Sequence, residues 1–370
     1  MSSGDLDTVI ARTLHRAIGA AKPGDLVVPP IVPAAIYYLP DQPSGPYQYG
    51  RWSNPTWDAL ESALAVLEQA EVVVFPSGMA AISAIFYSQL KNGDRALLPS
   101  DAYYTTRVFA ERFLAPMGIA IESCATTEFE MSSFDNFRLV FVETPSNPGL
   151  DICDLESVIA RAKKAGALVI VDNTTMTPIG QRPLDLGADA IVSSDSKAIN
   201  GHSDTCFGHV ASRNSALIAN VREWRRLSGA IPGFFEAWMV HRGLESLEVR
   251  YERMCDSAIA VATQLSAHPK VRMVKYPGLP SHPTHDLAKK QMRRFGSLIA
   301  VCFGTETEAE RFINRADFIQ AVTSFGGVHT SAERRGRWGD KVPPGFVRLS
   351  VGCEPPKVLW EEMKRVLDEL

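Results

Sequence analysis

The feature that most constrains the fold of this chain is a series of short runs of β-branched and apolar residues that alternate with helical patterns. Such runs occur at 71–75 (EVVVF), 95–98, 139–143 (LVFVE), 168–172 (LVIVD) and 189–193 (DAIVS). Apolar residues at helical spacing lie between them, at 57–69, 79–90 and 155–165. Strands that alternate with helices favour a mostly parallel sheet with helices on both faces, so we predict an α/β fold.

The 370 residues are enough for about two domains. We predict an N-terminal arm at 1–47, a ligand-binding α/β domain at 48–232 and a smaller α+β domain at 233–370. The arm contains the run PPIVP at 29–33, whose prolines remove backbone donors and exclude a central strand. We therefore expect this stretch to be extended, after a short helix nearer the N-terminus, and we expect the arm to contact a partner subunit.

The C-terminal part of the chain mixes both patterns. After the Gly- and Pro-containing stretch 228–232, one long helix is predicted from Phe234 to about Ser266. Further elements are predicted as strands at 298–303 and 346–351, and as helices at 307–314 and 357–370.

Composition excludes several classes of function. The net charge is −4, from 38 basic and 42 acidic residues, and no basic patch indicates nucleic-acid binding. No apolar run is long enough to span a membrane, and the first residues lack the pattern of a signal peptide. The six cysteines are scattered without a CxxC pair, which argues against disulfides and a metal site and favours the cytoplasm.

Three features lie where strands of the predicted sheet end. Asp172 ends the run LVIVD, Lys197 follows the run DAIVS, and Ser77-Gly78-Met79 joins a strand to a helix. In open α/β sheets, ligands bind beyond the carboxyl ends of the strands. Each feature also fits an ordinary structural role, since Ser77 can be a helix cap, Asp172 a turn former and Lys197 a solvated loop lysine.

Together the three features are more specific. The Ser-Gly-Met start of a helix offers backbone N–H groups to a phosphate. Asp172 can keep a pyridinium nitrogen protonated, and Lys197, flanked by the hydroxyls of Ser194 and Ser196, can form an imine. This combination predicts pyridoxal 5′-phosphate (PLP) as the cofactor.

Further motifs accompany these residues in one order along the chain. They are YGRWSNPT at 49–56, SGMAA at 77–81, ETPSNP at 143–148, VDNT at 171–174, SDSK at 194–197, GHSD at 201–204, SFGG at 324–327 and RLSVG at 348–352. With them the chain resembles the PLP-dependent Cys/Met metabolism (transsulfuration) family, and within it the bacterial cystathionine γ-lyases. The resemblance implies the aspartate aminotransferase-type fold (fold type I) and self-association as a homodimer or homotetramer.

The resemblance also implies roles for individual residues. Lys197 is the Schiff-base lysine and proton carrier, Asp172 pairs with the pyridinium nitrogen, and Tyr103 stacks on the ring and acts as acid or base. Arg348, assisted by Ser324, binds the substrate α-carboxylate. The other implied contacts are Ser77, Gly78, Met79, Ser194 and Ser196 at the phosphate, Asn147 near the ring oxygen, and Tyr49 and Arg51 from the neighbouring subunit, Tyr49 also at the substrate.

Three of these residues, taken singly, also fit purely structural roles. Tyr103 can be a core aromatic, Arg348 a member of a surface ion pair and Arg51 a helix cap.

The expected reaction is γ-elimination of cystathionine to cysteine, 2-oxobutanoate and ammonia, because the segments 143–154 and 324–338 are similar to the γ-lyase subgroup. Alternatives within the family are a cystathionine γ-synthase, a methionine γ-lyase and a cystathionine β-lyase. The non-enzymatic alternative is a catalytically silent binding protein with the same fold. The presence of Lys197, Asp172 and Tyr103 argues against it.

The sequence departs from the family pattern at the substrate side. His329 stands where many relatives carry a glutamate that recognises the far amino group of cystathionine, so either Glu333 or a neighbour replaces it or the preferred substrate differs. Tyr104-Thr105 replaces a usual Gly-Gly pair beside Tyr103, which predicts a more crowded pocket wall. The basic cluster Arg334-Arg335-Arg337 is either a solvated loop or a contact for a distal carboxylate.

Overall fold

The structure is a computed structural model that describes residues 3–15, 22–40 and 45–370. Its larger sheet has seven strands in the order β1-β7-β6-β5-β4-β2-β3. Five neighbouring strands, β6, β5, β4, β2 and β3, pair in parallel. Strand β7 runs antiparallel to both its neighbours, β6 and β1, so β1 has the same direction as the other five. The strands are β1 (Glu71–Phe75), β2 (Arg95–Pro99), β3 (Ala120–Cys124), β4 (Leu139–Glu143), β5 (Leu168–Asp172), β6 (Ala190–Ser193) and β7 (Gly208–Ser212).

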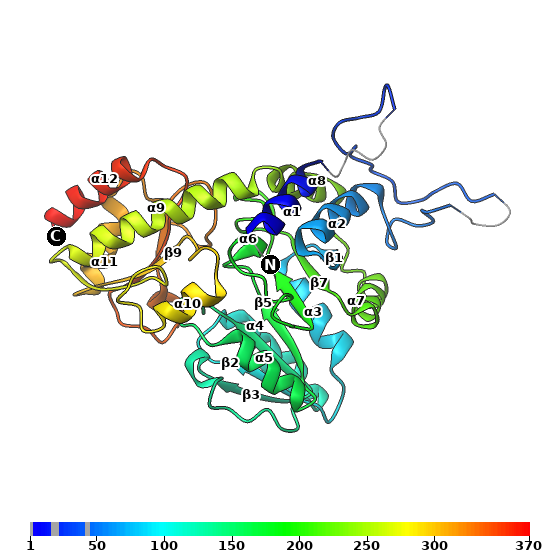
Figure 1. Cartoon of the computed structure of the whole chain (residues 1–370), viewed down its shortest axis with the longest axis horizontal. Coiled ribbons are helices and arrows are strands. Elements are labelled where there is room, and N and C mark those ends of the chain that lie inside the picture. The colour runs from blue at the N-terminus through cyan, green and yellow to red at the C-terminus, as the bar shows by residue number, and fades with distance from the viewer. Residues whose placement is uncertain (1–2, 16–21, 41–44) are drawn as a thin grey trace.

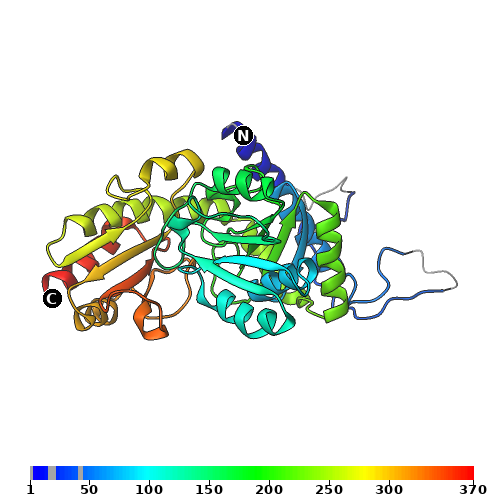
Figure 2. The same cartoon turned by 90° about the horizontal axis from the view of Figure 1, so that it is seen from below.

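Helices cover both faces of this sheet (Figures 1 and 2). Alternate residues of a strand enter different cores: in β5, Val169 and Val171 pack with α2 (Pro55–Glu68) and α5 (Leu155–Lys164). Ile170 packs on the opposite face, which α3 (Gly78–Gln89) and α7 (Ser215–Ser228) cover. The predicted α/β fold is thereby confirmed.

Two strands of this larger sheet were not predicted, because neither has a continuous apolar run. The sequence of β3 is AIESC, at the exposed edge of the sheet, and that of β7 is GHVAS.

A smaller antiparallel sheet lies toward the C-terminus, in the order β10-β11-β9-β8. Helices pack on one face and share a separate apolar core with it. Its strands are β8 (Val271–Lys275), β9 (Leu298–Phe303), β10 (Ser331–Arg334) and β11 (Phe346–Ser350), and its helices are α9 (Leu247–Ala267), α11 (Glu306–Arg315) and α12 (Pro356–Asp368). The remaining short elements are α4 (Tyr104–Phe109), η1 (Ala110–Leu114), η2 (Ala115–Met117), η3 (Thr126–Glu128), α6 (Thr177–Gly180), α10 (His285–Gln291) and η4 (Arg335–Trp338).

The prediction of one long helix from Phe234 to Ser266 is wrong. The chain forms two helices, α8 (Phe234–Leu244) and α9, separated at Glu245 and Ser246. The end of α8 packs on the loop after Lys197, where a Cβ on Gly243 would lie 2.5 Å from the carbonyl oxygen of Asn200. Arg250 of α9 donates to the Gly243 carbonyl at 2.7 Å, so a side chain satisfies a carbonyl that a continuous helix would satisfy internally.

Helix α8 contributes Ala237, Val240 and Leu244 to the core of the larger sheet, while the second half of α9 belongs to the core of the smaller one. Helix α8 thus follows the predicted limit at 232/233 but packs with the larger sheet. The domain limits at 47/48 and 232/233 stay predictions.

The N-terminal region has two described parts. Helix α1 (Ser3–His15) packs through Leu6 and Val9 against the core under α2. Residues 22–40 contain no helix and no extended strand, and they project from the body (Figure 1). Trp238 Nε1 donates to the Pro29 carbonyl at 3.1 Å, so the base of the arm is attached to its own chain.

The outer part of the arm exposes apolar side chains, among them Leu26, Val27, Ile36 and Tyr38. Contact of the arm with a partner subunit stays a prediction, and its segments 16–21 and 41–44 lie outside the described residues. No helix in the described ranges has the length and apolar character needed to cross a membrane.

Candidate active site

A pocket of about 460 Å³ opens where β4, β5 and β6 end and α3 begins. Residues from both sheets line it, because the loop before β10 and strand β11 reach over the edge of the larger sheet. It brings together most of the predicted site residues: Ser77, Gly78, Met79, Tyr103, Asn147, Asp172, Ser194, Ser196, Lys197, Ser324 and Arg348. Their individual roles stay predictions, but their convergence from segments far apart in the sequence is a property of the fold.

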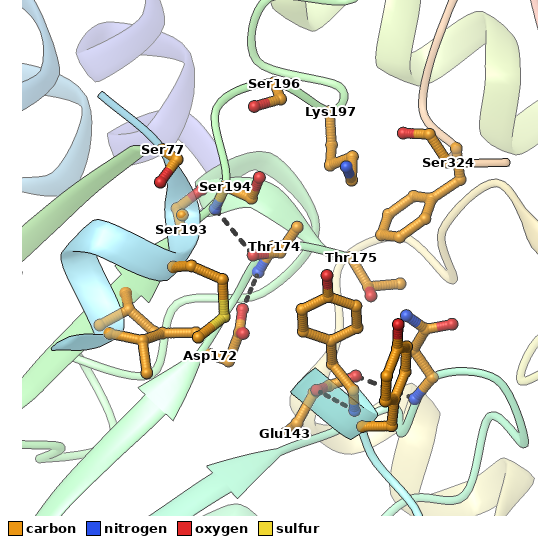
Figure 3. Close-up of a pocket in the computed structure, with 18 of the residues that line it drawn as sticks. Ser77, Glu143, Asp172, Thr174, Thr175, Ser193, Ser194, Ser196, Lys197 and Ser324 are labelled. Carbon is orange, nitrogen blue, oxygen red and sulfur yellow. Dashed lines mark hydrogen bonds between the residues drawn. The ribbon is translucent and has the colours of Figure 1, made fainter. Parts of the chain in front are cut away.

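Asp172 and Lys197 reach into the pocket from the ends of β5 and β6, which are neighbouring parallel strands (Figure 3). Asp172 is buried and its Oδ1 accepts the backbone N–H of Thr174 at 3.0 Å. Burial raises the pKa of Asp172, although the bonds from Thr174 and the charge of Lys197 partly oppose this. Burial, followed by the charge of Arg348, lowers the pKa of the Lys197 amine, which favours its unprotonated, nucleophilic form.

The start of α3 and the loop after β6 form one wall of the pocket. Ser77 caps α3 by accepting the N–H of Ala80 at 3.1 Å, which leaves the N-terminal end of a 12-residue helix facing the pocket. A Cβ on Gly78 would lie 2.6 Å from the Cβ of Ser194, so only glycine allows this close approach. Ser194 N–H donates to Thr174 Oγ1 at 2.8 Å, which joins this loop to the residue that orients Asp172.

These groups match the chemistry of PLP. A helix N-terminus beside Ser194 and Ser196 suits a phosphate, a buried carboxylate suits a pyridinium nitrogen, and a desolvated amine suits the aldehyde carbon. The donors present therefore fit the cofactor that the sequence predicts.

Glu143 is a member of the site that the sequence analysis did not single out as a functional residue. It is buried at the end of β4, paired in register with Asp172. Its two oxygens accept the backbone N–H groups of Tyr103 at 3.0 Å and of Asn147 at 2.9 Å. Burial, then the charge of Asp172, raises the pKa of Glu143 well above its ordinary value. One sequence signal could have identified Glu143 as a functional residue: like Asp172, it is an acidic residue at the end of a buried strand.

Arg348 lies on β11 at the far side of the pocket. Its Nη1 donates to Asn147 Oδ1 at 2.7 Å and its Nη2 to the Ser324 carbonyl and to Glu333 Oε2, both at 3.0 Å. Burial, followed by the charge of Arg335, lowers the pKa of Arg348 to about 10, so the guanidinium stays charged near neutral pH. The alternative that Arg348 belongs to a surface ion pair is wrong, because the residue is only 4% exposed.

Neither candidate for distal recognition lines the pocket. His329 is exposed, and Glu333 is only 1% exposed and lies beneath Arg348. Two other residues of the same segment, Arg335 and Trp338, line the pocket instead. Arg334 points elsewhere, with ion pairs to glutamates of α11.

The remaining predicted residues stand apart from this pocket. Tyr49 is 41% exposed on the segment after the arm, and Arg51 donates to the Arg226 carbonyl at 2.5 Å while lying over the Tyr49 ring. Their contact with a neighbouring subunit's site stays a prediction. Tyr104 does line the pocket, edge-on to Tyr103 with 5.7 Å between ring centroids, so the wall at this point carries two aromatic rings.

The chain is similar to known proteins along nearly its whole length. The profile of the Cys/Met metabolism PLP-dependent enzymes matches residues 13–368. A Streptomyces coelicolor protein, named provisionally as a cystathionine gamma-lyase, is 45% identical over 96% of this chain and 93% of its own length. The cystathionine gamma-lyase of Dictyostelium discoideum is 34% identical over 96% of both chains. Relatives at 35–36% identity are named cystathionine beta-lyase, cystathionine gamma-synthase and L-methionine gamma-lyase.

Solved structures agree with this. The crystal structure of metB from Corynebacterium glutamicum superposes with a TM-score of 0.94 at 34% identity, covering 98% of each chain. Fold and site together define a PLP-dependent enzyme with the fold type I architecture. The chain belongs to the Cys/Met metabolism family of PLP-dependent enzymes, which confirms the predicted resemblance and the predicted cofactor.

Proposed function

We propose that this protein cleaves cystathionine by γ-elimination, so that cystathionine and water give cysteine, 2-oxobutanoate and ammonia. The observation that carries the proposal is the pocket in which a buried lysine of lowered pKa, Lys197, lies opposite the buried arginine Arg348. The relatives named as cystathionine gamma-lyases support this choice among the family's reactions, because they align along almost the entire chain.

PLP, when bound, supplies an electron sink that stabilises negative charge on the substrate carbon next to the amine. The chain's own residues position the substrate and move its protons. The lowered pKa of Lys197 suits an amine that accepts a proton at Nζ and returns it along the substrate side chain. Asp172, whose Oδ1 accepts the Thr174 backbone N–H, would hold the ring nitrogen of PLP in its protonated form.

Arg348 binds the substrate α-carboxylate through its guanidinium, which Asn147 and Ser324 hold in one orientation. Glu143 fixes the backbone of Tyr103 and of Asn147, and so sets where the Tyr103 ring and the Asn147 amide lie. Tyr103, half-exposed at the pocket, is placed to exchange a proton with the leaving group.

Product analysis tests the proposal directly. Purified protein loaded with PLP is incubated with cystathionine, and keto acids and thiols are measured. Formation of 2-oxobutanoate and cysteine supports γ-elimination, whereas pyruvate and homocysteine would identify a β-lyase. Faster reaction with an O-acylhomoserine plus cysteine would identify a synthase, and faster reaction with methionine a methionine γ-lyase; kcat/KM is the quantity to compare.

We also propose that the enzyme assembles as a homodimer or homotetramer whose subunits share active sites. The exposed apolar side chains of the arm and the position of Tyr49 and Arg51 outside their own chain's pocket support this. A cytoplasmic location is proposed because all six cysteines are free and scattered. Sedimentation and mixing of two inactive variants, one at Arg51 and one at Lys197, would test the sharing of sites.

A further inference from the structure

A second arginine, Arg335, lines the pocket together with Arg348. Arg335 begins η4 directly after β10 and lines the pocket, although the residue is only 5% exposed. Trp338, at the other end of η4, lines the pocket as well. The roles implied by the family motifs leave both residues without an assignment.

Glu333 fixes the side chains of Arg335, Arg348 and Trp338 by accepting a hydrogen bond from each. Its Oε2 accepts hydrogen bonds from Arg335 Nη1 at 2.8 Å and from Arg348 Nη2 at 3.0 Å. Its Oε1 accepts from Trp338 Nε1 at 2.5 Å. One buried carboxylate therefore orients two guanidiniums and an indole, and it is fully used in doing so.

Arg335 keeps a donor edge for a ligand. Its Nε donates to Asp340 Oδ2 at 2.7 Å and its Nη1 to Glu333. Its third nitrogen, Nη2, has no hydrogen-bond partner in the described part of the chain. A guanidinium fixed on two sides and open on the third is preorganised for an anion.

The charges that line the pocket favour an anion at the far end of the substrate. The acidic lining residues are Glu143 and Asp172. Both oxygens of Glu143 already accept backbone N–H groups, and in the proposed function Asp172 would pair with the pyridinium nitrogen of PLP. No lining carboxylate among the described residues is thus left for a distal ammonium, whereas Arg335 offers a positive charge.

We propose that Arg335, oriented by Glu333 and Asp340, binds a second carboxylate at the far end of the substrate while Arg348 binds the α-carboxylate. This inference rests on the proposed function and narrows its substrate class to α-amino acids that carry a carboxylate at each end. Cystathionine belongs to that class, whereas homocysteine and methionine do not. Trp338, whose indole nitrogen donates to Glu333, lines the same pocket.

The test compares substrates that differ at the far end. In holoenzyme with Arg335→Gln, kcat/KM for cystathionine is expected to fall roughly ten- to hundredfold, mainly through KM, as for the loss of a hydrogen bond to a charged group. The kcat/KM for homocysteine and methionine should stay within about twofold of the wild-type value. Equal losses for all substrates would show that Arg335 acts only through Glu333 on Arg348, and would overturn the proposal, as would no loss at all.

Two further variants control for folding and for charge. Arg334→Gln removes the neighbouring positive charge, which is paired with Glu306 and Glu310 outside the pocket, and should leave the ranking of substrates unchanged. If Arg335→Gln does not fold, Arg335→Lys keeps the charge but loses the planar fork. It should then lower kcat/KM for cystathionine selectively, and a non-selective loss would count against the subsite.

A binding measurement decides the question without turnover. 2-Aminooctanedioate and 2-aminooctanoate have equal chain lengths and differ only in the far carboxylate, which has the spacing found in cystathionine. Calorimetry on wild-type holoenzyme should give at least about tenfold tighter binding of the dicarboxylate, and Arg335→Gln should abolish the difference. If the wild type shows this preference but does not cleave cystathionine, the proposed function fails and the subsite stands; equal affinities would overturn the subsite.

Discussion

His209 Nδ1 lies 2.8 Å from Asp195 Oδ1, and neither side chain is exposed to solvent. Asp195 sits between the two serines of the predicted phosphate subsite and two residues before Lys197, while His209 belongs to β7. On its other side the His209 ring is 3.4 Å from Glu68 of α2. This buried pair ties the loop that carries Lys197 to the sheet and to a helix behind it.

The pair predicts a pH-dependent stability. Burial lowers the pKa of His209, but Asp195 and Glu68 outweigh burial and raise it to about 10. Since the folded-state pKa is raised, the stabilisation is complete below the ordinary histidine pKa of about 6.5 and is lost as the pH rises through about 10. Denaturant unfolding should show His209→Gln to be about 3 kcal/mol less stable than the wild type near pH 6.

The difference between wild type and His209→Gln should shrink steadily between pH 7 and pH 10. The exposed His329 serves as a matched control, because His329→Gln should change stability little at any pH. A difference for His209→Gln that stays constant over this range would contradict a charged His209.

Replacing the pocket lysine should separate chemistry from folding. Lys197→Ala removes the only lysine that lines the described pocket. We expect turnover to fall roughly a thousandfold or more, because covalent attachment and proton transfer are lost together. The visible absorbance of the holoenzyme should change and the melting temperature should not fall. Lys164→Ala, an exposed lysine on α5, should behave as the wild type.

The close approach at the start of α3 predicts a defect in cofactor retention. In Gly78→Ala the new Cβ would lie 2.6 Å from the Ser194 Cβ, so the helix start or the loop after β6 must move. Equilibrium dialysis should show PLP affinity reduced at least about tenfold, since both sides of the phosphate subsite shift. Gly45→Ala, with 3.8 Å to its nearest neighbour, is the control. Unchanged PLP affinity in Gly78→Ala would show that the phosphate is bound elsewhere.

Glu333 is expected to affect every substrate, in contrast to Arg335. Glu333→Gln keeps the shape of the side chain but removes the negative charge that faces Arg348 and Arg335. Breaking a buried ion pair from one side costs about 3–5 kcal/mol of stability. KM should rise for cystathionine and for methionine alike, because Arg348, the proposed ligand of the α-carboxylate, loses its orientation. A rise confined to cystathionine would contradict this arrangement.

The sequence alone determined the class of fold, and it identified most of the residues that the fold brings together in the pocket. The strands with continuous apolar runs were predictable because burial on both faces requires such residues in every position, as in β4 and β5. Asp172 and Lys197 were predictable because the ends of neighbouring parallel strands meet at one edge of the sheet. The edge strand β3 and the polar strand β7 lack that signal.

Only the tertiary structure decided the substrate side of the pocket. His329, Glu333 and Arg335 lie in one short segment of the sequence. The sequence could not tell which of them contacts the far end of the substrate. Folding buries Glu333 beneath two arginines, leaves His329 exposed and turns Arg335 into the pocket. Local sequence carries the pattern of a strand or a helix, but which side chain of a loop faces a cavity depends on distant residues, here Arg348 on β11 and Asn147 after β4.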